Sequence, residues 1–222
     1  MSVEAHEAAA PGLAHHFRSH EEQRESATLG MWLFLATEIL FFGGLFAAYA
    51  LFRWQYPASF RAGSHELDIG LGTINTAILI GSSLSMALAV LGSQVGKPRL
   101  TAGLLAVTVA LGLAFLAIKA IEYHHKYVEH HVPGPGFRFE GPGAEHAQMF
   151  FVLYFAMTGL HALHMIVGVG LLAALIPFAA RGAYTPENHN FLEGAGLYWH
   201  FVDVVWIFLF PLLYLVGRHG VD

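Results

Sequence analysis

Five long apolar runs, separated by short polar stretches, dominate the pattern of the chain. The runs cover Leu29–Phe52, Ile69–Ser93, Leu100–Ile121, Ala147–Phe178 and Gly194–Val216. A helix needs about 20 mostly apolar residues to cross the roughly 30 Å hydrocarbon core of a bilayer. These runs are continuously apolar rather than alternating, which is not the pattern of a membrane β-barrel. We therefore predict an all-α membrane protein, a bundle of five transmembrane helices, whose third helix extends through a polar end to about residue 127.

The polar segment before the first run, residues 1–27, has no apolar core of the kind found in signal peptides. We predict a polar N-terminal tail over 1–27, followed by a single transmembrane domain over 28–222. Ser26 or Thr28 is the expected cap of the first helix, because short hydroxyl side chains bind free N–H groups at helix starts. Small residues in the second run, the pair Gly43–Gly44 in the first and Gly168–Gly170 in the fourth are expected to allow close helix approach, although such residues are common in any membrane helix.

Composition supports a membrane protein and excludes several other classes. The chain is 55% hydrophobic and 12% charged, about half the charged fraction of a soluble domain. Eleven Lys and Arg against 16 Asp and Glu give a formal charge of −5, which disfavours nucleic-acid binding. The absence of cysteine excludes disulfides, thiolate zinc sites and iron–sulfur clusters. The basic residues divide almost evenly between the two sides of the membrane and do not set the orientation.

One acidic residue, Glu38, lies near the middle of the first apolar run. An ionised carboxylate at that depth costs about 2.5–3.5 kcal/mol, so it is normally protonated, paired or facing water. Two interpretations stay open. Glu38 either locks two helices together as a hydrogen-bonded acid or takes part in proton or partner chemistry.

The last two runs carry histidines and acids at helical spacing. His161 and His164 are three residues apart and share one face of the fourth helix. Glu193 and His200 share a face of the fifth, and Asp203 follows one turn later. A network of His–acid pairs joining the helices is one interpretation. A di-metal carboxylate site is the other, but neither run contains the Glu-x-x-His motif of such sites.

The polar end of the third helix contains the pair Lys119 and Glu122 and four histidines within residues 123–131. The three-residue spacing predicts an ion pair, with the Lys119 side chain extending toward the membrane interface. The histidines are typical of a pH-sensitive surface, an adventitious metal site or simply a polar helix end beyond the bilayer.

Several stretches resemble one family, subunit III of the haem–copper terminal oxidases. The stretch 196–210, with Tyr-Trp-His-Phe-Val-Asp-Val-Val-Trp at 198–206, resembles the last helix of that family. Residues 157–168, with both histidines, resemble the preceding helix, and residues 32–42 resemble the helix that bears the membrane glutamate. Asn75-Thr76 and Ile121-Glu122-Tyr123 match two further positions, so that the similarity extends from about residue 28 to 217.

The resemblance implies a non-catalytic integral subunit of a proton-pumping oxidase that reduces oxygen to water in aerobic respiration. It implies haem and copper in partner subunits I and II, no cofactor in this chain, and bound phospholipid. A small fourth subunit and a larger respiratory supercomplex are further candidate partners. The residues expected to form the polar interior, or to contact subunit I or lipid, are Glu38, Asn75, Glu122, His161, His164, Glu193, Trp199, His200, Asp203 and Trp206. The family topology places the chain in the bacterial inner membrane with a cytoplasmic N-terminus and an outer C-terminus.

Alternatives within and outside this family stay open. The electron donor is cytochrome c or a quinol, and a nitric oxide reductase accessory protein has similar helices. A membrane di-iron enzyme is the candidate from a different class. Longer members of the family carry two additional helices that form one wall of a lipid cleft, and from the resemblance we expect this chain to be a short, five-helix form without that wall.

Overall fold

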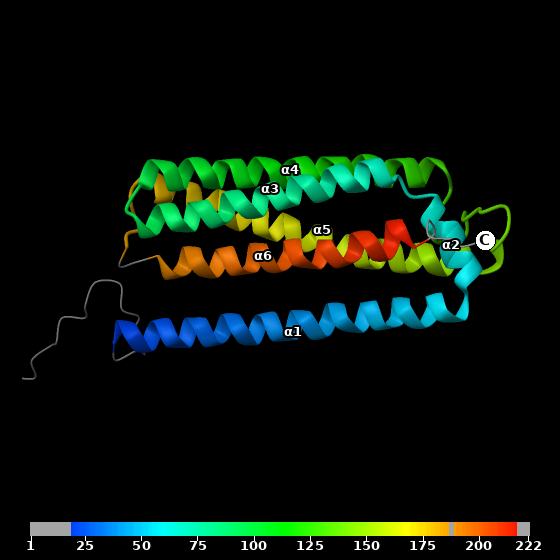
Figure 1. The fold of residues 1–222 in the computed structure, drawn as a ribbon, viewed down its shortest axis with the longest axis horizontal. Coiled ribbons are helices and arrows are strands. Elements are labelled where there is room, and N and C mark those ends of the chain that lie inside the picture. Colours follow the sequence, from blue (N-terminus) through cyan, green and yellow to red (C-terminus); the bar gives the residue numbers. More distant parts are fainter. Residues whose placement is uncertain (1–18, 187–188, 217–222) are drawn as a thin grey trace, which may run out of the picture. The chain divides into compact units, whose positions relative to one another are not determined.

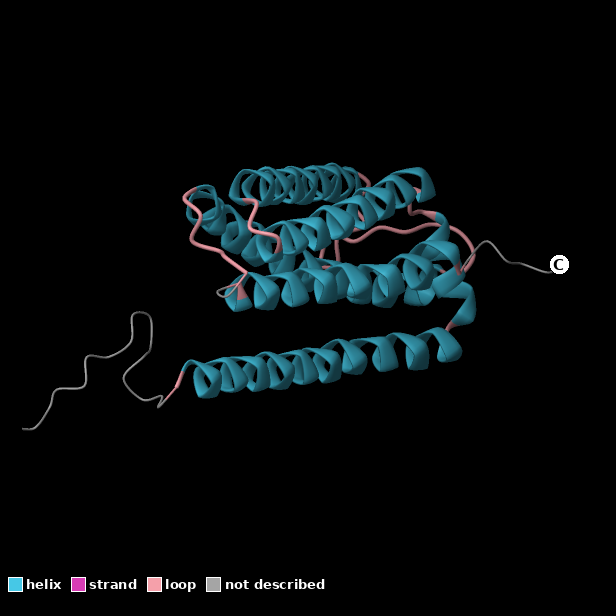
Figure 2. Cartoon of the chain, turned by 60° about the vertical axis from the view of Figure 1, so that its left-hand side comes forward, coloured by secondary structure: helices cyan, strands magenta, loops and turns pink. Residues whose placement is uncertain are grey.

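The computed structural model describes residues 19–186 and 189–216, and every regular element in this part of the chain is a helix (Figures 1 and 2). The elements are α1 (His20–Gln55), α2 (Pro57–His65), α3 (Ile69–Gln94), α4 (Pro98–Val128), α5 (Ala144–Ala180), α6 (Asn190–Phe210) and the π-helical turn η1 (Pro211–Leu215). The predicted all-α class is confirmed. Most of the predicted tail, residues 1–18, lies outside the described residues.

Five helices are long and apolar enough to cross a membrane, as the five runs predicted. They are Glu21–Gln55, Ile69–Gln94, Pro98–Val128, Ala144–Ala180 and Asn190–Leu215. Each begins or ends a few residues away from its apolar run, because apolarity marks the part of a helix inside the bilayer and not its ends.

The start of α1 shows the largest such difference. The helix begins at His20, so residues 20–27 are helical although they were predicted to belong to the tail. The hydroxyl of Ser19 accepts the backbone N–H of Glu22 at 3.1 Å, and the predicted cap at Ser26 or Thr28 is therefore wrong. Glu21 and Glu22 in the first turn favour this start, because acidic side chains stabilise the positive end of the helix dipole.

The chain divides into two compact units, Met1–Ile39 and Leu40–Asp222, with the boundary inside α1. In the second unit, α3 packs against α4 and α6, and α5 packs against the same two helices, so that these four form a closed ring. Aromatic side chains fill the ring. The largest fully buried ones include Trp199, Trp206, Tyr154, Tyr214, Phe115 and Phe150.

The short helix α2 was not predicted, because nine half-polar residues resemble a loop. Pro57 starts it, which suits a proline since the first N–H of a helix has no partner. Phe60 is fully buried and meets Phe150 of α5 edge to face, with ring centroids 5.6 Å apart. The link between α1 and α3 is therefore a packed element.

The π-helical turn η1 ends the last membrane helix. Pro211 cannot donate a backbone hydrogen bond, and the helix widens at this residue. The hydroxyl of Tyr49 donates to the carbonyl of Leu212 at 2.5 Å, which satisfies an acceptor at the widened turn. Tyr214, in the same turn, is completely buried.

Candidate functional site

A cluster of four polar side chains, Lys119, Glu122, Tyr154 and Tyr214, lies buried between α4, α5 and η1. We call it the inner cluster. The ammonium of Lys119 lies 3.2 Å from Glu122 Oε2 and donates to the hydroxyls of both tyrosines at 3.0 Å. Both hydroxyls donate in turn to Glu122 Oε1, at 2.7 Å from Tyr154 and 2.6 Å from Tyr214. The ammonium and the carboxylate therefore form an ion pair, and each of them also forms hydrogen bonds with both neutral tyrosine hydroxyls.

The position of Lys119 differs from the prediction. Its pairing with Glu122 is confirmed, but the residue is only 3% exposed and does not extend toward the interface. Its ammonium lies 4.9–5.7 Å from the ring centroids of four aromatic residues, where the ring quadrupole attracts a cation. These residues are Tyr123, Tyr154, Trp206 and Tyr214. Burial of an ion pair is tolerated only with such compensation.

A second set of polar contacts joins α3 to α6. His200 Nδ1 lies 2.7 Å from the hydroxyl of Ser83. The indole of Trp199 donates to Ser82 Oγ at 3.2 Å, and that of Trp206 donates to Thr76 Oγ1 at 3.1 Å. At the end of α3, Gln94 donates to Glu193 at 2.8 Å. The ring nitrogens of α6 thus meet small hydroxyl residues on α3.

Three predicted site residues are buried without such contacts. Asn75 and His161 make no side-chain hydrogen bond among the described residues, and neither carboxyl oxygen of Asp203 has one of ordinary geometry, although Ser83 lies close enough to influence that carboxyl. The ring of His161 lies against Phe115 and Trp206, with centroids 5.3 and 5.2 Å away. Asp203 lines a groove of about 390 Å³ between α3 and α6.

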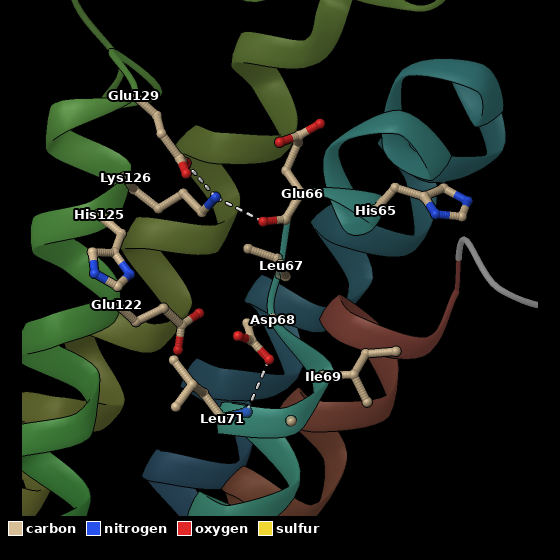
Figure 3. Close-up of a pocket in the computed structure, with 11 residues that line it drawn as sticks. His65, Glu66, Leu67, Asp68, Ile69, Leu71, Glu122, His125, Lys126 and Glu129 are labelled. Carbon is tan, nitrogen blue, oxygen red and sulfur yellow. Dashed lines mark hydrogen bonds and ion pairs between the residues drawn. The ribbon is translucent and has the colours of Figure 1, made fainter.

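A polar pocket of about 460 Å³ lies where the link between α2 and α3 meets the end of α4 (Figure 3). Lys126 projects into this region, and its ammonium bridges Glu129 Oε2 at 2.5 Å and the carbonyl of Glu66 at 2.7 Å. Beside them, burial and the charge of Lys126 lower the pKa of His131 against the opposing effect of the two glutamates. The protonated form of the His131 ring is therefore disfavoured.

The family described as cytochrome c oxidase subunit III matches residues 13–218, which include all five membrane-spanning helices and the whole inner cluster. The chain belongs to the cytochrome c oxidase subunit III family. The resemblance inferred from the sequence is thereby confirmed.

Individual relatives in the cytochrome c oxidase subunit III family cover nearly the whole chain. The cytochrome c oxidase subunit 3 of Thermostichus vulcanus is 35% identical over 91% of this chain and 92% of its own length. That of Alkalihalophilus pseudofirmus is 30% identical over 94% and 96%. The cytochrome bo(3) ubiquinol oxidase subunit 3 of Pseudomonas putida is 32% identical over 87% of each chain. Relatives of this chain are thus named either as cytochrome c oxidase subunit 3 or as ubiquinol oxidase subunit 3.

The structure arranges the predicted site residues of this family member in separate places rather than in one network. Glu122 belongs to the inner cluster, while His200, Trp199, Trp206 and Glu193 belong to the contacts between α3 and α6. His164 lies near Phe42 and Tyr198, and its Nδ1 faces the carbonyl of Leu160 at 2.9 Å. Glu38 lies in the first unit, Met1–Ile39, and its role stays a prediction.

Several residues of these clusters were not predicted from the sequence. Tyr154 and Tyr214 come from other helices, and no spacing relates them to Glu122. Ser83 and Thr76 could have been recognised from the sequence as a polar face of α3, because they are seven residues apart and therefore lie on the same side of that helix. The pair Lys126 and Glu129 had the same three-residue spacing as Lys119 and Glu122.

Proposed function

We propose that this chain is a non-catalytic membrane subunit of a haem–copper oxidase that stabilises the catalytic subunit and supports its proton uptake. The observation that carries the proposal is the inner cluster, which lies within the region matched by the family. Its charges compensate one another and tie α4 to α5 and η1. Such an arrangement suits a rigid scaffold in the bilayer. Haem and copper belong, on this proposal, to partner subunits I and II.

The proposal also specifies the electron donor of the oxidase, the membrane that holds the chain and the molecules that bind it. Cytochrome c is the proposed donor, and a quinol is the alternative because a relative is named as a ubiquinol oxidase subunit. Five crossings put the termini on opposite sides, and we propose a cytoplasmic N-terminus in a bacterial inner membrane. Phospholipid is a further expected ligand, since the bundle presents apolar faces to the bilayer.

The experiment that tests this proposal is purification of the tagged chain from native membranes in mild detergent. A reduced-minus-oxidised optical spectrum and metal analysis should show haem and copper with large partner subunits. Oxygen consumption with cytochrome c or with a quinol then identifies the donor. Haem iron without copper would favour the nitric oxide reductase branch. A chain that purifies alone, without haem, would contradict the proposal, and iron retained on it would favour the di-iron alternative.

Glu38 gives a second test of the proposed role in proton uptake. We expect Glu38→Gln to leave the complex assembled but to slow proton uptake or shorten its active lifetime several-fold, because a carboxyl at this depth can exchange a proton and an amide cannot. The decrease in rate should be smaller than the loss of a general base would cause, which is about 10²-fold or more. Proton uptake and turnover lifetime are measured on the purified complex in vesicles. Glu25→Gln, an exposed position on the same helix, is the matched control. A complex that fails to assemble, without a separate kinetic defect, would make Glu38 structural.

A further inference from the structure

The end of α4 brings together three side chains that can bind a metal ion. Glu66 comes from the link between α2 and α3, whereas Glu129 and His131 follow α4. One donor atom from each lies within 4.8 Å of the other two. We propose that these residues bind a divalent transition-metal ion of the zinc type at the edge of the membrane domain. This site is separate from the inner cluster and does not depend on the proposed oxidase function.

The geometry of the helix end places two of the three ligands. His130 has a left-handed backbone with φ of 59°. The N–H of His131 reaches back to the carbonyl of Lys126 at 2.9 Å, and that of His130 to the carbonyl of Tyr127 at 3.2 Å. These two bonds form a Schellman motif, which reverses the chain after the last helical turn. The reversal returns His131 to the side of Glu129.

The ring of His131 is held in place by aromatic neighbours. It stacks on Phe151 with centroids 5.0 Å apart and planes 27° apart, and Phe139 and Phe137 lie 5.4 and 6.4 Å away. Its Nδ1 lies 3.3 Å from Glu129 Oε2 and makes no hydrogen bond of ordinary geometry in the described part of the chain. The imidazole nitrogen and the carboxylate are thus two metal-binding groups already held close together. Binding an ion would require little movement of either side chain.

Lys126 already places a positive charge at this position. Its ammonium lies between Glu129 and the backbone of Glu66, as Figure 3 shows. The carboxylates of Glu66 and Glu129 outnumber the single lysine, and this excess of negative charge favours exchange of the lysine for a divalent ion. The adjoining pocket of about 460 Å³ has room for the displaced ammonium and for water ligands.

The ligand set indicates which metal would bind. Zn²⁺ accepts imidazole nitrogen and carboxylate oxygen, and sites with three protein ligands complete a tetrahedron with water. Calcium and magnesium require oxygen ligands in greater number. A bound ion would tie the end of α4 to the link between α2 and α3.

The test is zinc binding by the purified full-length protein, with whatever subunits accompany it. After chelator treatment and equilibrium dialysis against Zn²⁺, retained zinc is measured by mass spectrometry. We expect one tight site that is weakened at least tenfold in Glu129→Gln and His131→Gln, because each variant removes a ligand. X-ray absorption at the zinc edge should show one imidazole at this site. His124→Gln, an exposed histidine of the same segment, is the matched control and should bind as the wild type does.

A fourth variant separates metal binding from misfolding. Lys126→Met removes the competing ammonium while keeping an unbranched side chain of similar volume, so we expect it to bind Zn²⁺ more tightly than the wild type. A damaged fold would not produce such a gain. Equal zinc binding in the wild type and Glu129→Gln would overturn the proposal. An equal loss in His124→Gln would overturn it too, because it would indicate adventitious binding by exposed histidines. Unchanged or weaker affinity in Lys126→Met would contradict the competition on which it depends.

Discussion

Lys119→Met should lower the free energy of unfolding by about 3–5 kcal/mol, the range measured when one partner of a buried ion pair is removed. The variant leaves the Glu122 carboxylate buried without a cation, and both tyrosine hydroxyls lose the ammonium that donates to them. The methionine fills a similar volume, so the effect reports charge and hydrogen bonding rather than a cavity. Denaturant unfolding in detergent, followed by tryptophan fluorescence, measures it.

Two further variants decide whether the ion pair itself is responsible. The double variant Lys119→Met with Glu122→Gln removes both charges, and we expect it to recover more than half of the lost stability. Lys97→Met removes an exposed lysine at the start of the same helix and should change stability by no more than about 0.5 kcal/mol. If the double variant were no more stable than Lys119→Met alone, the two charges would not act as a pair.

The all-α fold and the number of membrane helices could be predicted because apolar runs directly reflect the thickness of the bilayer. The ends of the helices could not, since they depend on capping contacts such as the one between Ser19 and Glu22. The short helix α2 was hidden for a related reason. Nine residues cannot span a bilayer, and their helical state depends on packing against Phe150 rather than on composition.

The candidate site was predictable only where its residues share one helix. A spacing of three residues predicted the pair of Lys119 and Glu122, whereas their tyrosine partners come from helices far along the chain. The expected His–acid pairing shows the same limit. The Nδ1 atom of His200 lies 2.7 Å from the hydroxyl of Ser83 on α3, and the ring forms no ion pair with an acid in the described part of the chain. The packing of α3 against α6 decides which side chains meet, and the spacing of residues within one helix does not show it.

Small residues on two helices form the space that holds Trp199 of α6. A Cβ atom added at Gly112 of α4 would lie 2.7 Å from the indole, and one added at Gly168 of α5 would lie 3.0 Å from it. The prediction that Gly168 permits close packing is therefore confirmed. The same prediction fails at Gly43, Gly44 and Gly170, where a Cβ would meet no side chain from the rest of the described chain within 4 Å. Glycine in a membrane helix indicates close packing only where a large side chain faces it.

Trp199→Ala should therefore destabilise the bundle by about 3–5 kcal/mol, the range for truncating a buried tryptophan. The variant empties the space between α4 and α5 and removes the indole that donates to Ser82. Trp199→Phe should cost less, because it keeps an aromatic ring there. Gly168→Leu should cost about 1–3 kcal/mol by overfilling the same space. Denaturant unfolding in detergent measures all three. If Trp199→Ala unfolded like the wild type, the indole would not support the contact between α6 and the helices α4 and α5.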